Sequence, residues 1–301
     1  MKHRTKHILP KNLFFLALAI GFLLALRWFI TDGRIPGFEL GLRWIFFLVA
    51  MSIGGLGAFV TYFEYHGIGS QEGIVRRGNR TSHVAITFDD GPHPKHTPKI
   101  LDILKEKKVK ATFFAVGKKV EKYPEIAQRI VNEGHDIGNH TYSHKEMAPS
   151  TRKTIMKELS KTKEAIYKTT GVISSLFRPP RGIYSQASRG LIVDELGYKM
   201  ILWSVSSVDW RRTSPNWILN RIRRYARFGS IILFHDGGSS VKREGESRIN
   251  TVNALPMVID YLHSQDLRIV PVSQMLDGMS ADEDEFSFFD EPEPQPVSQK
   301  N

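Results

Sequence analysis

Five apolar runs along the chain each lead into polar residues that can do chemistry, and helix-like patterns separate the runs. The polar groups in question are Asp89–Asp90, His140–His144, Arg178–Arg181, Asp209–Trp210 and His235. An α/β barrel builds its active site in this way, because the carboxyl ends of its parallel strands meet on one face. The alternation therefore predicts an α/β barrel with one site assembled from all five runs.

Asp89 and Asp90 stand side by side where the apolar run from His83 ends. Adjacent carboxylates raise one another's pKa unless a cation keeps one of them ionised. A metal-dependent hydrolase uses such a pair, with one carboxylate as ligand and the other free as a base. Asp-Asp-Gly-Pro is also rich in turn formers, so on these residues alone a plain turn is an equal alternative.

His140 and His144 lie four positions apart, so a helical turn or a compact loop can aim both imidazoles at one point. Such a pair alone more often reflects ordinary surface or core histidines. Together with Asp90, however, the pair makes a common facial metal triad that leaves positions open for water and substrate. The prolines of Phe177–Tyr184 stiffen a loop that can hold Arg178 and the backbone of Arg181 in place.

The ordered motifs TFDDGP, HTYSH, RPPRGIY, VDW and LFH closely resemble the polysaccharide deacetylase family, the NodB homology domain of carbohydrate esterase family 4. The resemblance covers residues 80 to 277 and implies a distorted (β/α) barrel. It implies that Asp89 is the general base and His235 the general acid. It further implies that Asp90, His140 and His144 bind a divalent metal, usually zinc, with cobalt or manganese as alternatives.

The same resemblance gives supporting roles to four more residues. Arg178 and Asp209 would orient the catalytic groups, and the backbone N–H of Arg181 would hold a developing oxyanion. Trp210 could carry a sugar ring or an acetyl methyl group, although simple core packing is nearly as good a reading. The fourth motif departs from the frequent D-x-x-D-W pattern, because Ser206 occupies its first position. We expect altered tuning or substrate choice from this change, and we expect His93 and His96 to be bystanders.

These expectations favour a metal-dependent hydrolase that removes N-acetyl groups from amino sugars of a cell-wall polysaccharide, peptidoglycan or a chitin-like oligomer. Two alternatives stay open. One is an O-acetyl esterase or small-amide hydrolase on the same fold, and the other is a catalytically silent wall-binding protein.

Residues 1–63 are expected to form a membrane anchor of one or two transmembrane helices. The apolar segment 13–30 contains Arg27 and is marginal as a span, and a cleaved signal peptide is a competing reading. Segment 44–63 has no charged residue and is long enough to span. Basic residues before and after this region favour two spans and an inside domain, whereas a wall substrate favours an extracytoplasmic one. We expect the catalytic domain to face outward at the cell membrane.

The rest of the chain divides into three expected parts: a linker over 64–82, the catalytic domain over 83–279 and an acidic disordered tail over 280–301. Seven acids and one lysine give the tail −6, which leaves about +17 of the net charge of +11 for the remainder. This basic body suits an anionic wall or lipid surface, and without a recognised motif we expect no nucleic-acid binding. We expect helices over Thr97–Lys108, Ser150–Thr169 and Ser214–Arg227, and strands over Lys110–Val116 and Lys199–Val205.

Overall fold

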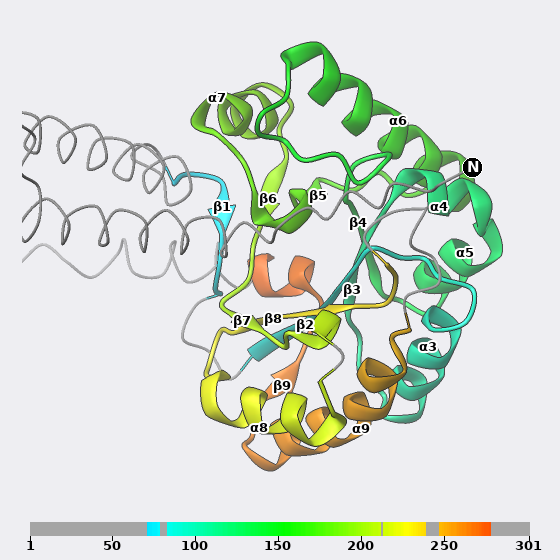
Figure 1. Cartoon of the computed structure of the whole chain (residues 1–301), viewed down its shortest axis with the longest axis vertical. Coiled ribbons are helices and arrows are strands. Elements are labelled where there is room, and N and C mark those ends of the chain that lie inside the picture. The colour runs from blue at the N-terminus through cyan, green and yellow to red at the C-terminus, as the bar shows by residue number, and fades with distance from the viewer. Residues whose placement is uncertain (1–70, 79–82, 212, 239–246, 278–301) are drawn as a thin grey trace, which may run out of the picture. The chain divides into compact units, whose positions relative to one another are not determined.

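The computed structural model describes residues 71–78, 83–211, 213–238 and 247–277 (Figure 1). The predicted anchor 1–63 and tail 280–301 lie outside these residues, as do 64–70 and 79–82 of the predicted linker. Within the described ranges, every helix is too short or too polar to cross a bilayer.

In the described part of the chain, nine parallel-paired strands form one sheet in the order β1-β6-β5-β4-β3-β2-β8-β7, with β9 paired to β2. They are β1 Ile74–Val75, β2 His83–Asp89, β3 Thr112–Ala115, β4 Asp136–Asn139, β5 Leu176–Phe177, β6 Lys199–Ile201, β7 Val205–Ser206, β8 Ile231–His235 and β9 Arg268–Ile269.

Strand β2 lies in the middle of the domain, and six of its seven residues are buried. Both of its faces are buried, as expected of a parallel strand covered on each side. The ring of Phe88 lies 5.0 Å from that of Phe113 on β3 and 5.9 Å from that of Phe234 on β8. The register places Asp89 opposite Phe114 and His235, so the ends of these strands are level.

The sheet is curled so strongly that one buried side chain joins strands on different sides of its interior. Arg178, just after β5, reaches Asp89 on β2 and the carbonyl oxygen of Ile201 on β6. Strands β6 and β7 are consecutive in the chain, yet no ladder joins them in the described part of the sheet. The domain is therefore the expected distorted barrel, open between its two edge strands, β1 and β7.

The helices lie outside the strands (Figure 1). They are α3 Thr97–Glu106, α4 Gly117–Lys122, α5 Pro124–Asn132, α6 Arg152–Thr170, α7 Gln186–Arg189, α8 Pro215–Tyr225 and α9 Ile249–Ser264. Short helical turns, η1 Pro180–Gly182, η2 Gly190–Glu195 and η3 Asp209–Arg211, complete the connections. The predicted starts of α3, α6 and α8 are confirmed to within two residues. At α8 the hydroxyl of Ser214 accepts from the N–H of Trp217, and Pro215 is the first helical residue.

Two predictions about the connections need correction. The single strand expected over Lys199–Val205 is wrong, because residues 202–204 separate β6 from β7 and the two strands pair with different neighbours. In the segment expected to be a linker, Ile74 and Val75 form β1 and pair with Met200 and Ile201. This part of the segment belongs to the sheet.

Candidate active site

The ends of the strands surround a cavity of about 480 Å³. Its lining residues are Asp89, Asp90, His140, His144, Arg181, Trp203, Trp210, Leu233, His235 and Arg248. Seven of the nine predicted site residues thus line one cavity. The other two, Arg178 and Asp209, are buried and bond to members of the lining.

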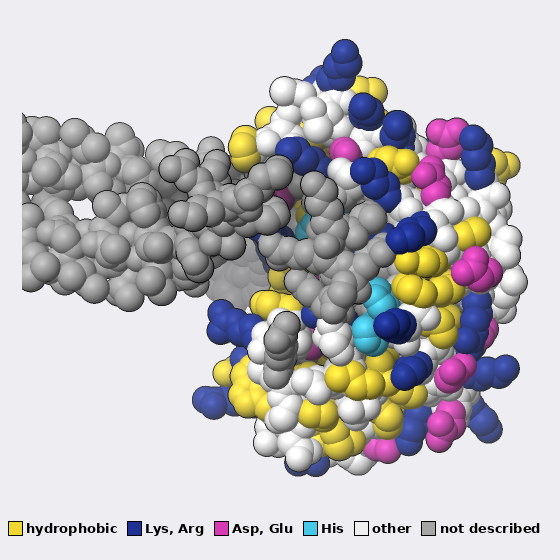
Figure 2. All heavy atoms as spheres, turned by 45° about the vertical axis from the view of Figure 1, so that its right-hand side comes forward, with side chains coloured by type: hydrophobic (Ala, Val, Ile, Leu, Met, Phe, Trp, Pro, Cys, Tyr) yellow, Lys and Arg dark blue, Asp and Glu magenta, His cyan; other side chains and the backbone are white. Residues whose placement is uncertain are grey.

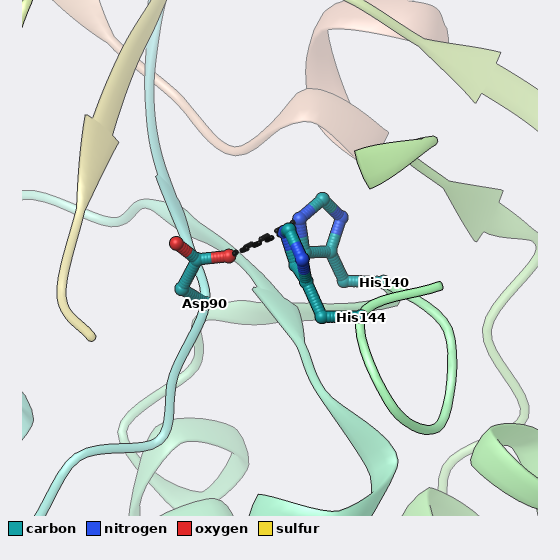
Figure 3. A group of neighbouring side chains, drawn as sticks. All are labelled: Asp90, His140 and His144. Carbon is teal, nitrogen blue, oxygen red and sulfur yellow. Dashed lines mark ion pairs between the residues drawn. The ribbon is translucent and has the colours of Figure 1, made fainter. Parts of the chain in front are cut away.

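Asp90 follows the last residue of β2 and has a φ of 76°. Few residues other than glycine adopt this left-handed conformation, and strain of this kind persists only where surrounding structure enforces it. Here the buried ammonium of Lys119 donates to the carbonyl oxygens of Asp90 and Gly238, at 2.6 and 2.7 Å. The turn aims the Asp90 side chain at the two histidines (Figure 3).

His140 and His144 approach Asp90 from the loop after β4 (Figure 3). Their Nε2 atoms lie 3.5 and 3.0 Å from Asp90 Oδ1. His140 Nδ1 lies 2.8 Å from the carbonyl oxygen of Arg178, which can only accept, so Nδ1 carries the proton. The Nε2 lone pair of His140 is therefore free to bind a cation.

This triad fits a divalent cation. One ligand atom from each residue lies within 4.8 Å of the others. Asp90 Oδ1 is buried and, these two imidazoles aside, has no hydrogen-bond partner among the described residues. Burial raises the pKa of Asp90, but His140 and His144 outweigh burial and hold this pKa well below its usual value. An ionised oxygen facing two imidazole nitrogens is a donor set typical of zinc and related metals.

Asp89 points the other way and is held by Arg178. Arg178 Nη1 donates to Asp89 Oδ1 and to Thr87 Oγ1, each at 2.7 Å. Its remaining donors reach the carbonyl oxygens of Ile201 and Leu202 at 3.0 Å. Asp89 Oδ2 is 3.9 Å from His140 Nε2 and lies beside the triad. Asp89 thus has one oxygen engaged and one available next to the cation site.

His235, at the end of β8, is paired with buried Asp209. Asp209 Oδ1 lies 2.8 Å from His235 Nδ1, and its Oδ2 accepts from the His235 N–H and from Thr251 Oγ1. Burial lowers the pKa of His235, but the carboxylate of Asp209, with smaller help from Asp90 and Asp89, raises it to about 9. The imidazole is therefore protonated at neutral pH and can donate from Nε2.

Comparison with known proteins identifies the family to which this site belongs. The family model described as polysaccharide deacetylase matches residues 76–201. A Bacillus cereus peptidoglycan-N-acetylglucosamine deacetylase is 38% identical over 194 residues, covering 64% of this chain and 68% of the relative. The chain belongs to the polysaccharide deacetylase family. The family and enzyme class predicted from the five motifs are confirmed.

Solved structures of this family share the fold. The Bc1960 peptidoglycan N-acetylglucosamine deacetylase matches with a TM-score of 0.62 and 36% identity, covering 67% of this chain and 92% of that one. BA3943 from Bacillus anthracis, described as a family 4 pseudoenzyme, matches with a TM-score of 0.61 and 30% identity, covering 67% and 68%. Because the fold occurs with and without activity, activity must be argued from the site.

Arg181 and Trp210, the two residues predicted to bind substrate, both line the cavity of the deacetylase site. Arg181 has a φ of 59°, and its guanidinium pairs with Glu146 at 2.8 Å. The side chain of Arg181 is thus paired with Glu146, and its backbone N–H is the group that can bind substrate. Trp210 is 43% exposed and meets the His235 ring edge-on at 5.3 Å. This exposure argues against simple core packing for Trp210.

Ser206 is not among the described residues that line the cavity. Its hydroxyl accepts from the N–H of Val208 at 3.3 Å, which closes a short turn before Asp209. An aspartate at this position could make the same bond, since Asx and Ser turns are alike. The departure in the fourth motif therefore preserves the local turn.

Sequence reasoning missed Trp203, Leu233 and Arg248 in the lining and Thr251 behind Asp209. No sequence motif marks Arg248, which follows residues 239–246 in the chain. It is buried and donates to the carbonyl oxygen of Gly237. His93 and His96, expected to be bystanders, are buried with their Nδ1 atoms 3.0 Å apart and stand outside the triad.

Proposed function

We propose that this protein removes N-acetyl groups from amino sugars of a cell-wall polysaccharide, most simply peptidoglycan or a chitin-like oligomer. The observation that carries the proposal is the placement of three groups around one cavity: the available oxygen of Asp89, a triad that fits a divalent cation, and a protonated imidazole. Metal-assisted amide hydrolysis uses a base, a cation and an acid of this kind together. The names of the matched relatives support an acetylated wall polymer as substrate.

Asp90, His140 and His144 would hold the divalent cation, for which zinc is the first candidate. When bound, the cation would supply Lewis acidity, which polarises an amide carbonyl and makes water a stronger acid. The free oxygen of Asp89 accepts a proton from water as the water oxygen bonds to the acetyl carbon. Arg178 keeps Asp89 oriented, because its guanidinium is bonded to Asp89 Oδ1 and to no other carboxylate in the described structure.

On breaking of the C–N bond, the amine nitrogen takes a proton from His235 Nε2, and acetate is the other product. Asp209 holds His235 in the orientation and charge state for this transfer. The backbone N–H of Arg181, fixed by its left-handed conformation, is suited to donate to the carbonyl oxygen as negative charge develops on it. Trp210 supplies a flat apolar wall for the sugar or the acetyl methyl group.

We further infer that the deacetylase domain faces outward from the cell membrane. The support is the apolar sequence of segments 13–30 and 44–63 together with a wall polymer as the proposed substrate.

Acetate release by the purified, zinc-loaded chain tests the activity. We expect release from N-acetylglucosamine oligomers, with little from acetylated xylan. Release from xylan alone would establish the ester-hydrolase alternative. No release from either, with zinc bound and His235→Ala indistinguishable from the parent, would establish a silent wall-binding protein.

A further inference from the structure

Helix α8 carries large aromatic side chains on its solvent side. Trp217 is 42% exposed and Tyr225 45%, and Phe228, just beyond the helix, is 52% exposed. The adjacent side of the helix is buried through Ile218, Leu219 and Ile222. The aromatic residues border this buried side yet leave about half of their surface exposed, and clustered exposed aromatic residues usually mark a surface that meets a partner.

Arginines stand between these aromatic residues. The guanidinium carbon of Arg221 lies 5.7 Å from the Trp217 ring centre and 5.0 Å from that of Tyr225. Arg224 lies 5.5 Å from the Tyr225 ring centre. Trp217, Arg221 and Tyr225 are spaced by four residues, so they share one side of the helix. Indole, guanidinium and phenol groups therefore form one continuous stripe along the flank of the helix, which we call the α8 stripe. Within it Arg221 is half-buried and donates from Nε to the carbonyl oxygen of Ser206 at 2.6 Å.

The chain segment that carries the α8 stripe is basic, and Asp260 on the neighbouring helix α9 is paired with Lys107. Residues 210–230 contain six arginines and neither an acidic residue nor a lysine. Figure 2 shows acidic side chains among the basic ones on the face that it draws. A basic region attracts an anionic membrane surface, and the attraction grows with each basic residue that lies close to it.

The shape and chemistry of the stripe favour a lipid surface over a polymer chain. The stripe lies on the outside of a helix, which is convex, whereas a bound polymer strand is normally held in a groove. Tryptophan, tyrosine and arginine are the residues that settle at the level of lipid headgroups. We propose that the α8 stripe docks the catalytic domain onto an anionic lipid surface.

The stripe also lies beside the point where the chain enters the domain. Arg77 donates to the carbonyl oxygen of Phe228 at 2.9 Å, and the Gly78 N–H donates to that of Gly229 at 2.8 Å. Arg77 follows the apolar segment 44–63 by fourteen positions. The end of α8 is therefore bonded to the part of the chain that follows segment 44–63.

The chain has no cysteine, so one introduced cysteine gives a unique labelling site. Asn220→Cys places an environment-sensitive fluorophore beside the stripe on exposed α8, and Ser160→Cys places it on exposed α6 as the control. The full chain is reconstituted in vesicles of phosphatidylcholine alone or with added phosphatidylglycerol. We expect the label at 220 to shift to an apolar environment only with phosphatidylglycerol, and the label at 160 to stay in water.

Arg221→Gln with Arg224→Gln should weaken the response at 220 by on the order of tenfold, while Arg152→Gln on α6 should leave it unchanged. Raised salt should weaken it as well, because the charge of Arg224 is exposed. An identical signal at 220 in both kinds of vesicle would overturn the proposal. A response to soluble polyphosphate but not to phosphatidylglycerol would also overturn it, and would assign the stripe to an anionic polymer.

Discussion

The guanidinium of Arg178 lies 2.7 Å from the carboxylate of Asp89, and both side chains are buried. The two residues come from strands that are three positions apart in the sheet, so their contact crosses the inside of the barrel. Burial lowers the pKa of Arg178, and the carboxylate of Asp89 partly offsets this change. The ion pair therefore has two roles: it orients the proposed base, and it is part of the buried interior of the domain.

Replacing Arg178 with glutamine should therefore destabilise the fold as well as stop turnover. Removing one partner of a buried ion pair leaves the other charge uncompensated, at a cost of about 3–5 kcal/mol. The urea midpoint of unfolding should fall accordingly. Arg152→Gln is the matched control, because its pair with Glu195 is exposed and should hardly matter. Equal midpoints for the two variants would contradict the structural role given to Arg178.

His140→Ala should lose stoichiometric metal and nearly all activity, because it removes one of three ligands. Elemental analysis of the purified variant measures this directly. His263→Ala changes an exposed histidine on α9 and should keep the full metal content. Full metal content in His140→Ala would show that the cation is held elsewhere.

Asp89→Asn should keep its metal but lose on the order of 10²–10⁴-fold in turnover, as expected for removal of a general base. Asp90→Asn should lose the metal, since Asp90 Oδ1 is the oxygen that faces both imidazoles. Metal content and acetate release are measured on both variants. If the two lose metal equally, our division of roles within the pair is wrong.

Asp209→Asn should shift the alkaline limb of the pH–rate profile downward. In the parent the pKa of His235 is raised to about 9, so the acid stays protonated until the pH approaches that value. The pairing also stabilises the fold, fully so below the ordinary pKa of 6.5, and this contribution is lost as pH rises through about 9. The variant's limb should move toward 6.5, with a smaller shift for Thr251→Val. If the alkaline limb of Asp209→Asn coincides with that of the parent, Asp209 does not set the pKa of His235.

Deleting residues 1–65 should leave a soluble, active deacetylase, because every assigned site residue lies after Val84 and β1 is retained. Deleting residues 1–80 is the informative comparison. It also removes β1 and the bond from Arg76 to the Tyr184 hydroxyl, so this product should unfold at lower temperature. Equal thermal midpoints would show that β1 adds nothing to the domain.

The local features of this fold were predictable because their causes are local. Helix α8 begins where Ser214 and Pro215 stand, since a cap and a fixed φ act within one turn. The strands could be placed by their apolar runs, and the five motifs were enough to predict the family. The pairing of β1 with β6 was not predictable, because it joins Ile74 to Met200 across a long stretch of chain.

The sequence by itself determined the residue types of the site and their order along the strands. Only the tertiary structure decided which of them meet. It turned Asp89 toward Arg178 and Asp90 toward the histidines, although the two aspartates are neighbours, because the left-handed turn at Asp90 separates their directions. It also brought Trp203 and Arg248 into the cavity. Such contacts depend on the curl of the whole sheet, which no short stretch of sequence encodes.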